Sequence, residues 1–390
     1  MKDEILIKKI CGDVKEELEN IGFSSDYVDF AKNKYKNFTF KIFELKPAEA
    51  NILKQTCLSL GFDAAVNRDA VTCKCEFSDA IINGSVYQIA KLCEKLEQQP
   101  FRLKKLSKIL KGKITPPKFY KISEKKFDYK KPYLMGILNI TPDSFSDGGK
   151  NFNPTTAIDN ALKMVDEGAA IIDIGGESTR PDATPISSEE ECRRILPVIS
   201  ELKKSNQNII ISVDTIHPET IVKAIELGAD ILNNVAQIEK FEPVFATLKN
   251  HKTPIVITHS DTIPPMPVTQ DFDGDIVEEI YKLFAKKIQY LKEKGLGENL
   301  PVLDVGIGFG KSINDQFELI KRADEFATLN CPILYGISRK SFIFKTFGLK
   351  NRDKITQIYA QHLISKGTNI LRVHDVKSHA DLIKYLDKIK

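Results

Sequence analysis

The chain has no tryptophan, and aromatic residues make up only 8% of its 390 residues. It also lacks any run close to the roughly 18 apolar residues that a membrane-spanning helix needs. Charged residues interrupt the first 20 positions, where a signal peptide would need an apolar core. With 42% hydrophobic and 28% charged residues, the composition is nevertheless that of a folded protein. We therefore expect a soluble, cytoplasmic protein with no membrane partner.

Histidine and cysteine are distributed in a way that fits neither a disulfide framework nor a tetrahedral zinc site. All six histidines follow residue 216, and the seven cysteines are spread along the chain in an odd number. This usage favours reduced thiols over a disulfide framework. Cys73 and Cys75 form one close pair, but without a second pair or a nearby histidine the spacing of a tetrahedral zinc site is incomplete. We interpret both as ordinary cysteines of a strand over 70–77.

Positive charge is in excess in one segment only. The net charge is +4, yet residues 101–131 alone carry twelve basic and two acidic side chains, a balance of +10. Such a segment could bind nucleic acid or another anion. The alternative is a solvated helix over 101–110 followed by a linker around Pro116 and Pro117. It is favoured because no aromatic stacking platform accompanies the charge. We expect a basic linker at 116–131 and no nucleic-acid partner.

Residues 1–115 predict a small α+β domain. Alternating apolar residues indicate strands over 38–45 and 79–84, and apolar residues at helical spacing indicate helices over 47–61 and 85–99. The segment contains no nucleophile–base pair, glycine-rich phosphate loop or metal-ligand cluster. Its sequence therefore predicts a fold but no role.

The remainder of the chain, 132–390, repeats one pattern eight times. Short apolar stretches rich in β-branched residues alternate with amphipathic helical stretches, and eight such units in about 260 residues are typical of a (β/α)8 barrel. A doubly wound open sheet is the alternative, but it more often has about five or six strands. We predict an α/β protein, a (β/α)8 TIM barrel preceded by the small α+β domain. The predicted strands are 133–138, 169–175, 209–214, 230–234, 254–259, 300–306, 332–338 and 369–375.

Each predicted strand is followed at once by polar residues. They are Asn139, the segment 177–180, Asp214, Asn233, His259, Asp304, the segment 338–340, and Arg372 with His374. An isolated case has an ordinary explanation, since an aspartate after a strand often caps the next helix. Because the carboxyl ends of barrel strands meet at one face, eight such placements predict an active site there.

Two of the loops at this face are long and rich in groups that bind anions. Residues 139–149 supply two glycines and the oxygen ligands of Asn139 and Asp147, and residues 175–181 add an arginine suited to bidentate phosphate contact. Together they suggest a diphosphate substrate and a Mg²⁺ ion. The segment 306–311, Gly-Ile-Gly-Phe-Gly-Lys, has the composition of a phosphate loop but lacks the spacing of one.

Six motifs over about residues 131–390 resemble the dihydropteroate synthase family. In chain order they are LMGILNITPDSFSDGG, IDIGGESTRP, SVDT, LDVGIGFGKS, YGISRKSFI and LRVHDV. The resemblance implies a barrel enzyme of folate biosynthesis that requires Mg²⁺ and is a target of sulfonamides. Such an enzyme joins 6-hydroxymethyl-7,8-dihydropterin diphosphate to p-aminobenzoate and releases pyrophosphate. It also implies a homodimer, for which the last helix is a candidate interface.

The resemblance also implies a role for individual residues. A pterin pocket would comprise Asp214, Asn233, Asp304 and Lys340, with Asp304 accepting from two adjacent N–H groups of the pterin and Lys340 donating to its carbonyl and N5. The diphosphate would lie near Asn139, Arg372 and His374, and Mg²⁺ would be held by Asn139 and Asp147. The aminobenzoate would lie between Phe145, Thr179, Arg180, Pro181, Lys340 and Ser341, with its carboxylate near Ser341. The catalytic residues implied are Lys340, Arg372, His374 and Arg180.

The sequence departs from the family pattern at 258–261, which reads Thr-His-Ser-Asp where the family often has Met-His-Met. This departure affects the packing expected under the pterin ring. Two other functions share part of the pattern. A pterin-binding methyltransferase with a corrinoid partner would have no use for the two long loops. A non-catalytic pterin-binding or regulatory protein would be expected to lose the diphosphate site first. The residues that argue against it are all intact: Asn139, Arg180, Lys340, Arg372 and His374.

Overall fold

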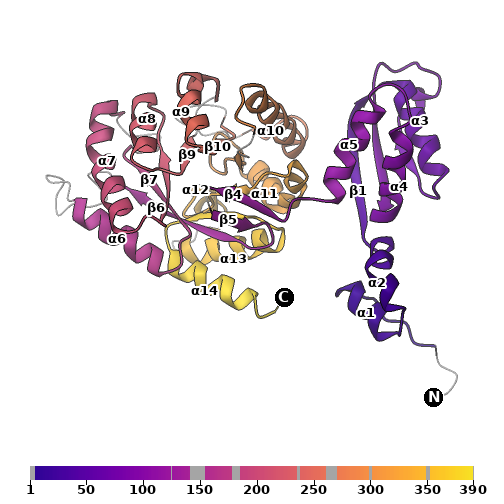
Figure 1. Ribbon diagram of the computed structural model, residues 1–390, viewed down its shortest axis with the longest axis horizontal. Coiled ribbons are helices and arrows are strands. Elements are labelled where there is room, and N and C mark those ends of the chain that lie inside the picture. The colour runs from indigo at the N-terminus through magenta and orange to yellow at the C-terminus, as the bar shows by residue number, and fades with distance from the viewer. Residues whose placement is uncertain are drawn as a thin grey trace. The chain divides into compact units, whose positions relative to one another are not determined.

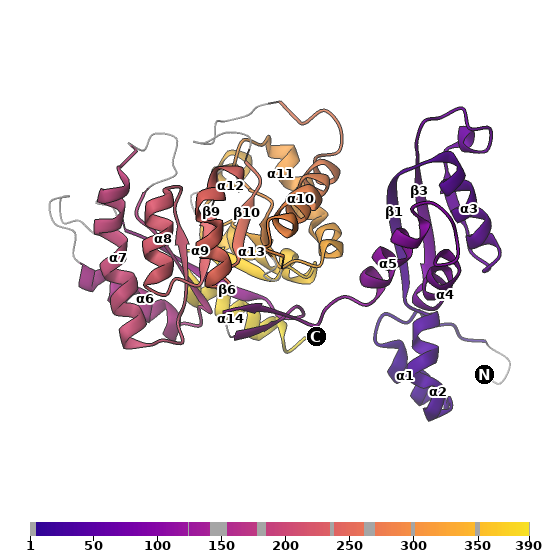
Figure 2. The same ribbon diagram turned by 45° about the horizontal axis from the view of Figure 1, so that its top comes forward.

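The computed structural model describes residues 5–123, 125–140, 154–177, 185–234, 238–260, 270–297, 301–347 and 352–389. The chain divides into two compact units, Met1–Pro116 and Pro117–Lys390. The first unit is a three-stranded antiparallel sheet with helices, and the second is a closed barrel of parallel strands that its helices surround (Figures 1 and 2). Among the described residues, no helix combines the length and apolar character needed to cross a membrane.

The first unit packs its sheet against helices over one apolar core. Its sheet has the order β1-β3-β2, and Leu53, Ile82 and Leu92 are fully buried in the core. Residues 70–77, predicted as a strand, instead follow a 3-10 turn that the Asn67 side chain caps, and Cys73 is exposed with a φ of 54°. The elements are α1 (Val14–Asn20), α2 (Ser25–Ala31), η1 (Lys32–Lys34), β1 (Asn37–Leu45), α3 (Pro47–Leu58), β2 (Ala64–Val66), η2 (Arg68–Ala70), β3 (Ser78–Ser85), α4 (Val86–Leu96) and α5 (Leu103–Ile114).

The segment 116–131, predicted as a basic linker, contains a β-hairpin that belongs to the second unit. Its strands are β4 (Phe119–Ile122) and β5 (Lys125–Asp128), paired antiparallel. The lysines of the hairpin are exposed, whereas Tyr120, Ile122 and Phe127 are buried against the barrel. The alternation of a half-buried strand is thus present in the sequence beneath its high charge.

The second unit has the predicted (β/α)8 architecture. Its strands are β6 (Tyr133–Asn139), β7 (Ile171–Gly175), β8 (Ile210–Asp214), β9 (Ile231–Asn234), β10 (Ile255–Thr258), β11 (Val302–Asp304), β12 (Ile333–Tyr335) and β13 (Ile370–Val373). They close in sequence order, with β13 pairing with β6. The helices are α6 (Pro154–Asp166), α7 (Ser188–Ser205), α8 (Pro218–Glu226), η4 (Ile238–Val244), α9 (Phe245–Asn250), α10 (Ile276–Glu293), α11 (Ile313–Lys321), η5 (Ala323–Leu329), α12 (Ser341–Phe347), α13 (Arg352–Ser365) and α14 (Val376–Leu386).

Inside the barrel, an apolar layer lies beneath a polar one. Every strand contributes one buried apolar residue near its start, and these eight pack with the hairpin in one cluster: Met135, Ile171, Ile210, Ile231, Val256, Val302, Leu334 and Ile370. Two residues further along, the same face of each strand carries Ile137, Asp173, Ser212, Asn233, Thr258, Asp304, Gly336 and Arg372. The strand period of two therefore delivers six polar side chains, all but Ile137 and Gly336, to the barrel interior just below its C-terminal face.

Candidate active site

Arg372 on β13 is the centre of a buried ion-pair cluster. Its Nε donates to Asp173 Oδ2 at 2.6 Å, and its Nη2 donates to Asp214 Oδ2 at 2.9 Å. Asn233 Nδ2 donates to both oxygens of Asp173, at 3.2 and 3.1 Å. Four strands, β7, β8, β9 and β13, thus hold one hydrogen-bonded set of polar groups in the barrel interior. The structure brings together the predicted residues Asp214, Asn233 and Arg372.

The environment of this cluster shifts the pKa values of its members. Burial raises the pKa of Asp214 to about 7, and the neighbouring Asp173 adds to the shift while Arg372 opposes it. Burial works against the charge of Arg372, but Asp173 and Asp214 outweigh it, so the pKa of the guanidinium is raised and it stays charged. The cluster is therefore a fixed cation beside a carboxyl group that titrates near neutral pH.

Asp304 and Lys340 lie next to this cluster at the ends of β11 and β12. Asp304 is 8% exposed, and one of its carboxylate oxygens, Oδ1, accepts from the backbone N–H of Gly306 at 2.9 Å. Burial raises the pKa of Asp304. Lys340 Nζ lies 4.3 Å from the centroid of the Phe309 ring, and burial lowers the pKa of Lys340 to about 8 even though Asp304 and Asp214 favour its charge.

A strained turn directs Lys340 inward. Its neighbour Arg339 has a φ of 58°, in the left-handed region that side chains disfavour. The guanidinium of Arg339 points away to Asp353, with Nε and Nη2 donating to the two carboxylate oxygens at 2.9 and 3.1 Å. This bidentate pair on α13 holds the turn in place. Ser341, predicted to lie near the aminobenzoate carboxylate, is the first residue of α12 and is exposed.

His374 lies just beyond the end of β13. The hydroxyl of Ser338 accepts from the backbone N–H of His374 at 3.2 Å and lies 2.9 Å from its Nδ1. A hydroxyl that accepts the backbone hydrogen bond can donate its own proton to Nδ1, which favours the tautomer with a proton on Nε2. Burial lowers the pKa of His374 to about 4, and Arg339 and Arg372 add to this shift. The imidazole is therefore a neutral donor at pH 7.

Asn139 ends β6 and pairs in register with Gly175 of β7. A Cβ atom at Gly175 would lie 3.9 Å from Asn139 Oδ1, so the absence of a side chain there leaves room beside the amide. The other predicted residues of the two long loops, Phe145, Asp147, Thr179, Arg180 and Pro181, lie outside the described residues. Within the described ranges, no three His, Cys, Asp or Glu residues group as a metal site.

Sequence reasoning missed Asp173, which is fully buried and contacts both Arg372 and Asn233. The signal was available, because an aspartate in the apolar run Ile-Ile-Asp-Ile needs a buried partner. It also missed Glu191 of α7, which accepts from Thr215 Oγ1 at 2.5 Å. Glu191 Cγ would lie 2.8 Å from a Cβ at Gly176, so it packs against the start of the loop that follows β7.

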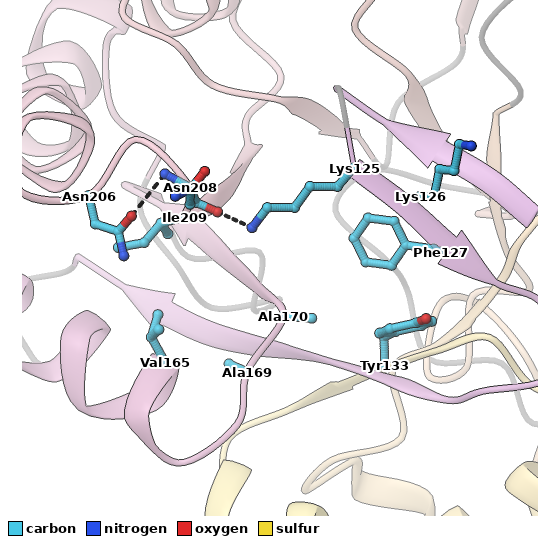
Figure 3. Close-up of a pocket in the computed structure, with 10 residues that line it drawn as sticks. All are labelled: Lys125, Lys126, Phe127, Tyr133, Val165, Ala169, Ala170, Asn206, Asn208 and Ile209. Atoms are coloured by element: carbon cyan, nitrogen blue, oxygen red, sulfur yellow. Dashed lines mark hydrogen bonds between the residues drawn. The ribbon is translucent and has the colours of Figure 1, made fainter.

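A cavity of about 390 Å³ lies elsewhere in the second unit. It is lined by residues that precede β6, β7 and β8 or open them, so it is at the N-terminal end of the barrel, away from Asp304 and Lys340. Figure 3 shows Lys125 of the hairpin reaching to the backbone carbonyl of Asn208, with Phe127 and Tyr133 side by side. None of the predicted site residues lines this cavity. Active sites of such barrels lie at the opposite, C-terminal face.

Comparison with known proteins agrees with this geometry. Residues 135–374 match the model of a family described as pterin binding enzyme. The dihydropteroate synthase of Streptococcus pyogenes is 37% identical over 260 residues, which cover 66% of this chain and 95% of the relative. A Helicobacter pylori protein named bifunctional dihydropteroate synthase/dihydropteroate reductase is 31% identical over 391 residues, covering 99% of both chains.

Two solved structures are similar to the second unit. The Xanthomonas albilineans dihydropteroate synthase with 4-aminobenzoic acid is 31% identical with a TM-score of 0.63, and covers 70% of this chain and 98% of its own. The Yersinia pestis dihydropteroate synthase in a sulfonamide drug complex gives the same four values. This chain belongs to the family of pterin-binding enzymes. Within that family its activity is that of a dihydropteroate synthase, a transferase of folate biosynthesis.

Proposed function

We propose that the chain condenses 6-hydroxymethyl-7,8-dihydropterin diphosphate with p-aminobenzoate at the C-terminal face of the barrel. In this proposal the pterin binds between Asp304 and Lys340. The second oxygen of the Asp304 carboxylate has no partner among the described residues, so it can accept from the amino and ring N–H groups of a pterin. The Lys340 ammonium, which makes no hydrogen bond with a described residue, can donate to the ring carbonyl and N5.

The leaving diphosphate lies, in this proposal, beside Arg372 and His374. The dihydropterin ring can delocalise positive charge to its exocyclic methylene, so the C–O bond breaks first and its electron pair leaves with pyrophosphate. The charge that develops there is stabilised by the fixed guanidinium of Arg372 and by the Nε2–H of His374. Since Asp173 and Asp214 already hold Arg372 in place, little reorganisation is needed during the reaction.

Asn139 and Asp147 would hold Mg²⁺, for which an amide oxygen and a carboxylate are suitable hard ligands. The position of Asn139 at the C-terminal end of β6, beside Gly175, which has no side chain, supports this placement. When bound, the ion would neutralise negative charge on the diphosphate. The aminobenzoate would lie between Phe145, Thr179, Arg180, Pro181, Lys340 and Ser341, its amine attacking the methylene carbon and then losing its proton. A sulfonamide, which has the shape of an aminobenzoate, would occupy the same place.

The placement of Lys340 beside Asp304 carries this proposal, and pyrophosphate release tests it. The full chain with Mg²⁺ should release pyrophosphate in step with dihydropteroate formation, and only when p-aminobenzoate is present. Lys340→Ala should lose both dihydropterin binding and turnover. Lys321→Ala, which removes an exposed lysine that pairs with Glu318, is the matched control and should keep both. Unchanged dihydropterin affinity in a folded Lys340→Ala variant would overturn the assignment.

A second activity, reduction of dihydropteroate, is suggested by the Helicobacter pylori relative. That relative aligns with 99% of this chain, including the first unit, whereas the Streptococcus pyogenes synthase covers only 66% of it. The test is oxidation of NADPH, or of a reduced flavin, on addition of dihydropteroate to the full chain and to residues 117–390. A rate in the full chain alone would assign reduction to the first unit, and no rate in either would exclude it.

The chain is further proposed to work as a homodimer in the cytoplasm. Tyr385 at the end of α14 is 73% exposed and Ile389 just beyond it is 78% exposed, which supports the last helix as an interface. The free state of all seven cysteines supports a reducing compartment. Sedimentation of the full chain beside a Tyr385→Glu variant tests the dimer, and a monomeric wild-type chain would contradict it.

A further inference from the structure

The lysine that closes the segment 306–311 is buried rather than presented to a ligand. Lys311 is 6% exposed, and its Nζ donates to three backbone carbonyls, those of His259 at 3.0 Å, Gly306 at 2.9 Å and Phe309 at 3.0 Å. An ammonium has three N–H groups, so these carbonyls can use all of its donors. Despite its resemblance to a phosphate loop, the segment therefore does not use this lysine to hold a phosphate.

The three carbonyls tie together two loops at the C-terminal face. His259 follows β10, whereas Gly306 and Phe309 follow β11. Direct hydrogen bonds lead from this clamp to Asp304, since the backbone N–H of His259 donates to the Asp304 carbonyl at 2.9 Å and that of Gly306 donates to its carboxylate at 2.9 Å. The ammonium thus fixes the backbone that holds the Asp304 carboxylate.

The same clamp leads to Lys340 through Phe309. Its ring lies under the Lys340 ammonium, and the loop that carries it is compact, with positive φ at Gly306, Gly308 and Gly310. At Gly308 a Cβ would lie 2.9 Å from Lys340 Cδ, so the loop backbone itself packs against this side chain. A loop of this kind has no regular hydrogen-bond ladder, so its shape depends on a central donor such as the Lys311 ammonium.

We propose that Lys311 is a positioning residue for pterin recognition. Its buried ammonium holds the Asp304 carboxylate and the Phe309 ring in place together. Through them it sets the distance between Asp304 and Lys340, which bind neighbouring polar groups of the pterin in the proposed function. This inference rests on the proposed roles of Asp304 and Lys340. A side chain at position 311 that cannot donate to all three carbonyls would loosen the Asp304 carboxylate and the Phe309 ring at once. Lys311 itself contacts neither substrate in this proposal.

The experiment measures dihydropterin affinity by titration calorimetry, together with kcat, KM and the thermal unfolding midpoint, on full-length variants. Lys311→Met keeps the side-chain length and removes the three donors, and Phe309→Leu removes the ring. We expect each to raise the dihydropterin Kd about 10- to 100-fold, with a larger effect on KM than on kcat. Because both act on one loop, the double variant should be no worse than the weaker-binding single variant.

Two controls separate positioning from a loss of stability. Lys321→Met removes an exposed lysine on α11, and Leu202→Ala opens a buried position on α7 away from this loop. Leu202→Ala should lower the unfolding midpoint while leaving the Kd within about twofold of the wild-type value. Lys311→Gln, which keeps an N–H₂ donor, should give a Kd between those of the wild type and Lys311→Met, and it carries the test if Lys311→Met does not fold.

Three results would overturn the inference. One is a Kd for folded Lys311→Met, or for Lys311→Gln in its place, within about twofold of the wild-type value. Another is multiplication of the Lys311→Met and Phe309→Leu effects in the double variant, and the third is an equal loss of affinity in Leu202→Ala. Asp304→Asn distinguishes this failure from that of the proposed function. If Asp304→Asn binds dihydropterin normally the pterin site itself is wrong, whereas weak binding by Asp304→Asn with normal binding by Lys311→Met removes only the positioning role.

Discussion

Arg372 Nε lies 2.6 Å from Asp173 Oδ2 across the barrel strand that separates them. Arg372 is on β13 and Asp173 on β7, and β6 runs between these strands. The register partners of the pair on β6 are both apolar, Ile137 for Asp173 and Met135 for Arg372. The salt bridge therefore joins two strands that are not neighbours in the sheet, and it passes over β6 inside the barrel.

Replacing Asp173 by Asn should weaken this bridge while preserving its volume. Of its two salt bridges the guanidinium would keep the one with Asp214, and breaking a buried ion pair costs about 3–5 kcal/mol. We expect a lower unfolding midpoint and a fall in kcat/KM of at least about tenfold. Steady-state pyrophosphate release and calorimetry measure both. Asp381→Asn, whose partner is the exposed Lys384, is the control, and wild-type kcat/KM in Asp173→Asn would contradict the prediction.

Dihydropterin binding should weaken in mildly alkaline solution. The pKa of Lys340 is lowered to about 8 by burial, so the free enzyme loses this charge as the pH rises through 8. If only the ammonium form binds, the Kd rises about tenfold for each pH unit well above that value. Titrations from pH 8 to pH 10, above the pKa of about 7 of Asp214, measure the change. Over this range Lys340→Arg should bind less tightly but with a flat profile, because a guanidinium stays charged, and a flat wild-type profile would refute the prediction.

Gly306→Ala should disrupt the loop that carries Phe309. Gly306 has a φ of 71°, and an added Cβ would lie 1.9 Å from the carbonyl oxygen of His259, one of the three acceptors of Lys311. The His259 carbonyl can make room for the Cβ only if the loop backbone moves. Because this loop positions Asp304 and Phe309, dihydropterin affinity should be lost. Gly367→Ala is a matched control, since its φ is 83° and its Cβ would meet nothing within 4 Å. It should cost only about 1 kcal/mol of stability and keep full affinity. Equal behaviour of the two variants in calorimetry would be inconsistent with this account.

Ser341→Ala should weaken p-aminobenzoate more than the pterin. A hydrogen bond to a carboxylate contributes about 1.5–3 kcal/mol, so the KM for p-aminobenzoate should rise about tenfold or more while the dihydropterin Kd stays unchanged. A sulfonamide should inhibit the wild type in competition with p-aminobenzoate and less strongly in the variant. Initial rates at varied p-aminobenzoate give both results. Ser365→Ala on α13 is the control, and an unchanged KM in Ser341→Ala would remove this residue from the site.

The barrel could be predicted from the sequence because each strand is a short β-branched run with a polar residue after it. The same pattern predicts Asp214, Asn233, Asp304 and Arg372 as candidate site residues, since each is the last or last but one residue of its strand. Asp173 was not, although its position inside an apolar run indicates that it needs a buried partner. That partner, Arg372, lies 199 residues away, and because barrel closure sets such pairings, the local sequence does not identify it.

The structure of two other segments differs from the prediction. The hairpin 119–128 was interpreted as part of a linker because its exposed lysines dominate its composition, although its buried face is aromatic. Residues 70–77 have strand-like residues, yet Asn67 accepts from the Asp69 backbone and starts a turn instead. The buried aromatic face decides the structure of the hairpin, and a short-range polar contact decides that of the turn. The average composition of a segment indicates neither.

The floor formed by Tyr120, Ile122, Phe127 and the eight apolar strand residues has a consequence for side reactions. These side chains are all buried and close the N-terminal end of the barrel. In the proposed function, the reaction chamber would therefore be closed at this end, and solvent would reach the pterin methylene from the C-terminal face. Protection of the short-lived cation from hydrolysis would then depend on that face, and the yield of dihydropteroate per diphosphate consumed would measure it.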